Sequence, residues 1–298
     1  MLTNWLNALP GAASQGIIWG IMAVGVYITY KILDIADLTV DGSICTGAAV
    51  CTILITNGVN IWLSILCAII AGMLCGFVTG ILHTFMGIPA ILAGILTQLM
   101  LWSANLKIMG KANIALSIRN YDLLVTSMPS HIWNTILTLV FFGAVLVALL
   151  YWFFGTELGA SLRATGNNLR MSRAQGINTE KTKTLALVIS NGIVALSGAL
   201  LAQYSGNADI NMGRGAIVIG LAAVIIGEAV TSKISKNFAV KLAGVIIGGV
   251  IYFFVYQTVI FMGLDADLLK MLSAVVVAIF LALPYWNKKY FQKSRKGA

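Results

Sequence analysis

Few residues of this sequence could carry out covalent chemistry on a substrate. The two histidines, His83 and His131, lie far apart, and the four cysteines contain no CxxC pair, so a zinc site has little support. No HExxH or GxSxG motif occurs, which leaves a hydrolase without a visible metal or nucleophile. No GxxxxGK[ST] loop occurs, so the chain is not expected to hydrolyse ATP by itself. We expect no catalytic residue, metal or cofactor in this chain.

The charged residues are the remaining candidates for function, and they are concentrated in two basic segments. Residues 155–183 are polar and lie between two long apolar runs. Their charged residues are Arg163, Arg170, Arg173, Lys181 and Lys183 against Glu157 and Glu180. Five more cations lie in the last fourteen residues, and the two segments hold more than half of the 19 Lys and Arg. The positive-inside rule places such clusters on the cytoplasmic side of a membrane, so we expect no nucleic-acid binding.

The composition indicates that these segments flank membrane spans. The chain is 59% hydrophobic and 10% charged, with a mean hydropathy of +0.93, whereas soluble domains average about 25% charged residues. Apolar runs near 20 residues recur, and roughly 20 are needed to cross a bilayer. The first ten residues lack the basic stretch of a cleavable signal peptide. We predict an all-α, polytopic protein of the bacterial cytoplasmic membrane, in direct contact with the lipid bilayer.

About nine spans are predicted, one of them short or broken. They cover 14–33, 34–58, 61–82, 90–106, 132–154, 184–204, 216–230, 242–262 and 268–284. The second opens with three aspartates and is rich in Thr, Ser and Gly, which indicates a partial span beside a polar path. We predict one transmembrane domain over 14–284, with halves 14–154 and 184–284 around the loop 155–183, and a basic cytoplasmic tail at 285–298.

The charges also predict the orientation. If the central loop and the tail are both cytoplasmic, four spans separate them and the N-terminus lies outside. The outer loop 107–132 opposes this, because it holds Lys107, Lys111 and Arg119 against a lone Asp122. At the end of the first span, Lys31 and Asp34 are three residues apart and could pair on one helix face.

An internal repeat relates 38–50 to 211–224. Three positions align, namely Gly42 with Gly215, Gly47 with Gly220 and Ala49 with Ala222. In the predicted topology the copies run in opposite directions, and such inverted repeats place the translocation path between the halves. A separate stripe of Gly72, Gly76 and Gly80 predicts close helix packing.

Polar residues within the spans are candidates for that path. Ser43, Thr46 and Asn191 are the residues we select, although each could equally satisfy a neighbouring backbone carbonyl. Ionisable groups deep in the spans are nearly absent, which counts against an ion-coupled carrier. The energy for transport is therefore expected from another chain, received by the central loop.

The central loop has the signals of a short, doubly capped helix. Gly166, Asn167 and Asn168 break the preceding helix and supply an N-cap. Leu169–Gln175 then predicts about two turns ended by Gly176, and Asn178 or Thr179 caps the next span. An exposed helix here would offer a partner Leu169, Arg170, Met171 and Arg173. An ordinary positive-inside loop is the alternative, and it needs neither cap.

The sequence LRATGNNLRMSRAQGIN resembles the cytoplasmic loop of ABC-importer permeases of the branched-chain amino acid and ribose type. The matching positions are Gly166, Asn167, Asn168, Ala174, Gly176, Ile177 and Asn178. DLTVDGS (37–43) is similar to the DLSVG-type sequence of that family, with Asp41 inserted before the glycine, and 213–228 resembles its glycine-rich span. The closest subgroup is the one paired with tryptophan- or tyrosine-type binding proteins.

The resemblance implies the membrane subunit of an ABC importer that works as a homodimer and moves a small solute inward, with an amino acid, and an aromatic one in particular, as the expected substrate. Two ATPase subunits, which would hold ATP and Mg, would dock on the coupling residues 166–171, 173, 174, 176 and 177. An external solute-binding protein would dock on the outer face. Two alternatives stay open: a secondary active transporter with inverted repeats, and a polytopic membrane enzyme.

Overall fold

The computed structural model describes residues 2–117, 121–128, 131–231 and 237–261, with five isolated residues beyond them. The helices of this part are α1 (Leu2–Tyr27), the π-helical η1 (Ile28–Ile32), α2 (Val40–Thr56), α3 (Ile61–Thr84), α4 (Ala90–Met109), α5 (Ile132–Gly155), α6 (Glu157–Asn167), α7 (Leu169–Ala174), α8 (Thr179–Ser205), α9 (Ala216–Thr231) and α10 (Phe238–Phe261). The predicted all-α membrane fold is confirmed. The predicted ninth span and the basic tail lie outside the described ranges.

Among the described residues, six helical segments are long and apolar enough to cross a membrane. They are α1 continued by η1, and α3, α4, α5, α8 and α10. The first helix begins at Leu2, well before the predicted start of the first span at residue 14. The helices α2 and α9 have 17 and 16 residues. At 1.5 Å per residue each is shorter than a hydrocarbon core of about 30 Å.

Helix α8 forms the centre of the bundle. Every residue from Ser190 to Tyr204 is buried, which is expected of a helix that other helices surround on all sides. Helix α3 packs against it through Gly72, Gly76 and Gly80, where an added Cβ would overlap atoms of α8. All three residues of the glycine stripe thus lie at one helix contact, where small residues let backbones approach closely.

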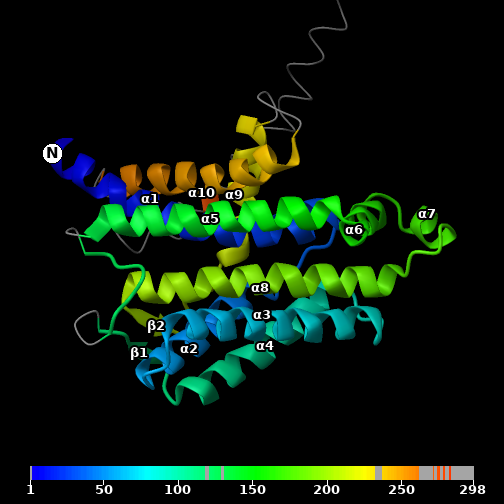
Figure 1. Cartoon of the computed structure of the whole chain (residues 1–298), viewed down its shortest axis with the longest axis horizontal. Helices are drawn as coiled ribbons and strands as arrows, with labels where there is room; N and C mark the ends of the chain where they lie inside the picture. The colour runs from blue at the N-terminus through cyan, green and yellow to red at the C-terminus, as the bar shows by residue number, and fades with distance from the viewer. Residues whose placement is uncertain are drawn as a thin grey trace, which may run out of the picture.

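The two ends of the bundle differ in character. Figure 1 shows α6 and α7 at one end, and the N-terminus with a small sheet at the other. The sheet pairs β1 (Asn113–Ala115) with β2 (Asn207–Asp209) in antiparallel register. Both strands fall in segments predicted as loops, so the outer loop and the linker after α8 are joined by backbone hydrogen bonds.

The second predicted span is indeed partial. The chain after η1 is not helical and enters the bundle, and α2 begins beside the middle of α8, where Ser43 hydrogen-bonds to Asn191. From this point α2 runs toward the sheet end, where Cys51 lies beside Gln203. Helix α2 therefore occupies only the half of the bundle that lies nearer the sheet.

The seventh predicted span is also partial, which corrects the expectation of a full crossing at 216–230. Helix α9 begins beside the first turn of α2, because the backbone N–H groups of Gly215 and Ile217 each donate a hydrogen bond of 3.0 Å to the Asp41 carboxylate. It ends near Lys31, at the α6 end of the bundle. The N-termini of α2 and α9 therefore meet at mid-bundle, and the helices leave in opposite directions.

Candidate functional site

The polar segment 155–183 folds into α6, α7 and the first turn of α8. Each helix begins at a residue whose side chain caps its backbone: Thr156 for α6, Asn168 for α7 and Asn178 for α8. The Asn168 side chain accepts a hydrogen bond of 3.1 Å from the backbone N–H of Met171. The predicted break before residue 169 and the short helix after it are present. Satisfying these terminal N–H groups fixes where each helix begins.

The end of α7 is equally well defined. Gly176 has φ 80°, a left-handed conformation that favours glycine. The N–H groups of Ile177 and Gly176 donate to the carbonyls of Ser172 and Arg173 at 3.0 Å each, which is a Schellman motif. The Arg173 guanidinium also donates a hydrogen bond of 2.9 Å to the Thr179 hydroxyl. Helix α7 is thus held rigidly against the start of α8.

Helix α6 connects α7 to the membrane helices by direct contact. Gly166 lies against the backbone of Ile32 at the end of η1, so closely that an added Cβ would overlap the carbonyl. Arg163 donates a hydrogen bond of 2.7 Å to the carbonyl of Phe154 near the end of α5. A force on α7 would therefore reach both α1 and α5 without passing through a flexible loop.

The outer side of this segment is available to a partner. Leu169 is 41% exposed and Met171 58% exposed. Arg170 is exposed, and its guanidinium makes no hydrogen bond or ion pair with any described residue. Of the other predicted coupling residues, Asn167 and Ala174 are exposed, and Ile177 is half-buried. The short helix α7 thus combines apolar and cationic contacts on one rigid surface.

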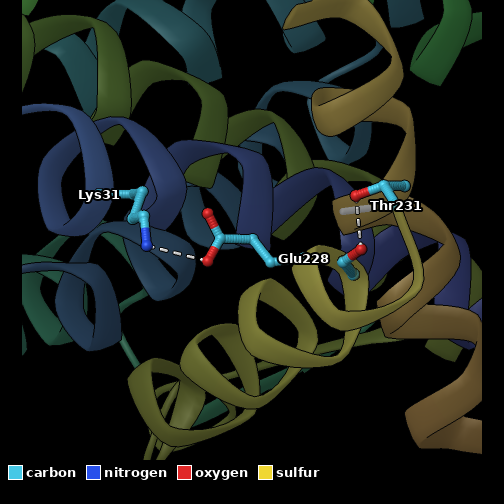
Figure 2. A network of polar contacts seen from close by, with 4 residues as sticks. Lys31, Glu228 and Thr231 are labelled. Carbon is cyan, nitrogen blue, oxygen red and sulfur yellow. Dashed lines mark hydrogen bonds and ion pairs between the residues drawn. The ribbon is translucent and has the colours of Figure 1, made fainter. Parts of the chain in front are cut away.

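An ion pair lies beneath this surface, between η1 and α9. The Lys31 ammonium lies 2.9 Å from a Glu228 carboxylate oxygen. Figure 2 shows the pair, with the Thr231 hydroxyl donating to the Gly227 carbonyl one turn from Glu228. The predicted Lys31–Asp34 pair was wrong, because Asp34 has left the helix with φ 57°. The pair lines a polar crevice of about 730 Å³ together with Arg163 of α6.

The predicted path residues lie inside the bundle. Ser43 and Asn191 are fully buried and bonded to each other at 2.6 Å. The Asn191 side-chain N–H group also donates 2.8 Å to the buried carboxylate of Asp37. The Thr46 hydroxyl donates to the carbonyl of Gly42 in the same helix. Within this subunit, Ser43 and Asn191 join α2 to α8, and a role for them in the path stays a prediction.

Sequence reasoning missed three charged residues at mid-bundle depth. Asp37 and Asp41 were assigned to the edge of a span, and Arg214 to a polar linker. The structure places all three near the middle of the bundle, because the chain before α2 and the chain before α9 both enter it. The sequence signal for this depth was that the apolar part of each segment is too short for a full membrane span. The expected scarcity of deep ionisable groups is therefore wrong.

The sequence matches a known family of transport proteins and several of its members. The family model described as "Branched-chain amino acid transport system / permease component" matches residues 9–283. The "Tyrosine transport system permease protein" of Clostridioides difficile (strain R20291) is 40% identical over 277 residues, which cover 93% of this chain and 91% of that protein. The "Fructose import permease protein FruF" of Bifidobacterium longum (strain NCC 2705) is 27% identical over 263 residues, 83% of this chain and 69% of that protein.

A solved structure shares the fold. The structure titled "PsaBC from Streptococcus pneumoniae in complex with Fab" aligns with a TM-score of 0.52 at 14% sequence identity. The alignment covers 99% of this chain and 100% of that chain. The likeness in fold therefore extends over nearly the whole length of both chains.

Proposed function

This chain belongs to the branched-chain amino acid transport system permease family, and we propose that it is the membrane-spanning subunit of an ATP-driven amino acid importer. Members of the family are transport subunits, so the chain itself is not proposed as an enzyme. The substrate that we propose is an aromatic amino acid. It is supported by the 40% identity to a tyrosine transport permease along nearly the whole of both chains.

We propose that α7 is the docking site of the ATPase. The observation that carries this proposal is the construction of α7. Capped at Asn168 and closed at Gly176, it presents Leu169, Arg170 and Met171 outward while Gly166 behind it contacts η1. An ordinary loop would need none of these fixed contacts. ATP and Mg would be held by the partner, whose closure would push α7 and so move α1 and α5.

The assembly follows from the same proposal. Two copies of this chain would bind two ATPase subunits at their α6–α7 ends, which would face the cytoplasm. The opposite end, with the N-terminus and the β1–β2 sheet, would face outward and meet a solute-binding protein (Figure 1). The protein would lie in the bacterial cytoplasmic membrane, with the basic tail on the inner side.

Co-purification tests the docking proposal. Arg170→Glu in the full chain, co-expressed with its ATPase, should reduce recovery of the ATPase at least tenfold. A charge reversal at the centre of an interface removes an attraction and adds a repulsion, and central Arg residues often cost roughly 2 kcal/mol or more when truncated. Leu169→Asp with Met171→Asp should have a similar effect by placing charges on the apolar contact.

A matched control is Lys181→Glu, which makes the same change in charge on an exposed residue of α8. It should keep most of the bound ATPase. Equal losses from Arg170→Glu and Lys181→Glu would assign binding to the general positive field. Full recovery with all variants would reject α7 as the docking site.

The ion-coupled carrier needs its own test, because Asp37 lies buried at a depth where coupling residues of carriers occur. Vesicles containing this chain alone should show no uptake of L-tyrosine under a proton or sodium gradient. Uptake should require the ATPase, ATP and the binding protein together. Gradient-driven uptake by the chain alone would replace the importer with the carrier.

A further inference from the structure

A cavity of about 270 Å³ lies beside the meeting point of α2 and α9. Its polar lining comes from three segments: Asp41 from α2, Gln98 and Asn105 from α4, and Arg214 from the linker before α9. Trp102 of α4 supplies an aromatic surface between Gln98 and Asn105. The volume is close to the lower end of small-molecule sites, roughly 300 Å³, and the lining combines a few polar groups with apolar ones, as such sites do.

The buried side chain of Asn105, beside this cavity, lacks the hydrogen-bond partners that a buried amide needs. Its side chain is 1% exposed, and neither its oxygen nor its nitrogen has a hydrogen-bond partner among the described residues. A buried polar atom without a partner costs roughly 1–3 kcal/mol. An amide beside a cavity that is buried with both its polar atoms unpartnered indicates that something polar occupies the space.

The walls of the cavity are fixed in position. The Asp41 carboxylate accepts two backbone hydrogen bonds from the first residues of α9. Gly213 packs so closely against Asp41 and Ile44 that an added Cβ would overlap them. A carboxylate has about four acceptor sites, so that of Asp41 keeps at least one for a further donor. Asp41 therefore stays able to accept from a ligand without releasing α9.

The depth of the charges matters. Asp41 belongs to the first turn of α2, and Arg214 lies beside it. This turn is level with the middle of α8. Arg214 is exposed, and its guanidinium makes no ion pair or hydrogen bond with a described residue. Unpaired guanidinium groups at this depth face water or a partner, since lipid cannot solvate them. The open side of the cavity therefore faces an aqueous path, and lipid does not cover it.

We propose that this cavity binds the zwitterion of an aromatic α-amino acid on its way through the membrane. The inference rests on the proposed transport of an amino acid and assigns its site within this chain. Arg214 would pair with the ligand carboxylate, which it can hold through two parallel hydrogen bonds. Asp41 would accept from the ligand ammonium, the ring would stack on Trp102, and Asn105 would gain its missing partner. Asp41 is also the residue at which the chain departs from the DLSVG-type sequence.

Equilibrium binding to the full chain in nanodiscs, without ATPase or binding protein, tests the site. The probe is radiolabelled L-tyrosine, and the competitors are tyramine, which lacks the carboxylate, and 3-(4-hydroxyphenyl)propionate, which lacks the ammonium. L-Tyrosine should bind saturably, and each competitor should bind at least tenfold more weakly. No saturable binding of L-tyrosine to the wild-type chain would overturn the proposal and leave a cavity filled with water only.

Substitutions then assign the contacts. Arg214→Gln should weaken L-tyrosine at least tenfold and leave tyramine unchanged, because tyramine has no carboxylate to lose. Asn105→Ala should weaken L-tyrosine, whereas Lys107→Gln, at an exposed cation on the same helix, should not. Equal weakening of L-tyrosine and tyramine by Arg214→Gln would overturn the assignment of the carboxylate.

The same measurements separate this inference from the function beneath it. Saturable zwitterion binding by a chain that never retains an ATPase would reject the importer and keep the site. ATPase binding and ATP-driven uptake with an Arg214→Gln variant that transports normally would reject the site and keep the importer.

Discussion

The Ser43 hydroxyl of α2 donates a hydrogen bond of 2.6 Å to the side-chain oxygen of Asn191 on α8, and both residues are fully buried. The amide nitrogen of the same Asn191 donates to Asp37, whose carboxylate also accepts from the backbone of Thr39. One amide thus fixes the non-helical segment before α2 and the first turn of α2 against the central helix.

Asn191→Ala should therefore destabilise the protein strongly. It removes the donor to a buried carboxylate, worth roughly 1.5–3 kcal/mol, and the acceptor of Ser43, worth about 1 kcal/mol. Thermal unfolding in detergent should show a large decrease in midpoint, and Ser43→Ala a smaller one. Asn134→Ala, at an exposed residue of α5, is the control and should shift the midpoint little. An unchanged midpoint for Asn191→Ala would contradict a structural role for the network.

The contact between α3 and α8 predicts a graded response to added side chains. Gly76→Ala places a Cβ against the backbone of Leu187, which cannot move aside, and overpacking of this kind costs typically 1–3 kcal/mol. Gly80→Ala meets only the side chain of Thr184 and should cost less. Gly143→Ala in α5 is the control, because its Cβ would lie 3.4 Å from the nearest side-chain atom. Thermal unfolding should rank the variants in this order; equal midpoints for Gly76→Ala and Gly143→Ala would contradict it.

Gly166→Ala should uncouple ATP hydrolysis from transport. An added Cβ would push α6 away from Ile32, while α7 and its exposed residues would stay intact. We expect normal recovery of the ATPase, near-normal ATP hydrolysis and uptake reduced at least fivefold in proteoliposomes. Gly155→Ala, with open space around its Cβ, should leave uptake unchanged. Loss of ATPase binding with Gly166→Ala would instead show that Gly166 supports the docking surface itself.

The Lys31–Glu228 pair should contribute little to stability. The side chains are 49% and 31% exposed, and pairs of this kind contribute about 0.2–1 kcal/mol. A double-mutant cycle with Lys31→Met and Glu228→Gln should give a coupling energy in that range, measured by thermal unfolding and reduced by added salt. A coupling well above this range, or one that salt does not change, would indicate a pair shielded from water in the assembled complex.

The sequence predicts the elements that depend on local signals. Asn168 and Gly176 define α7 through capping and a left-handed residue, which act within a few positions. The glycine spacing on α3 likewise predicts the face that packs on α8. Helix lengths in apolar stretches follow from composition, and the predicted bounds are close to the observed ones except for the first helix, which begins at Leu2.

Long-range pairing could not be predicted in the same way. Lys31 pairs with Glu228 because η1 and α9 meet in space, whereas the sequence offered Asp34 at helical spacing. The depth of Asp41 and Arg214 depends on both entering segments and on the hydrogen bond from Gly215 to Asp41. Hydropathy alone assigns such residues to loops, because it cannot tell a polar segment outside the bilayer from one that enters it.

The meeting of α2 and α9 at mid-bundle has a consequence for biogenesis. Asp37 and Asp41 are synthesised early, but their partners, Asn191 and Gly215, come more than 150 residues later. A nascent chain that ended before α8 would hold both carboxylates without these donors, so residues 34–60 cannot settle at their final depth during synthesis of the first half. The N-terminal half is therefore expected to complete its insertion only after α8 and the linker behind it have entered the bilayer.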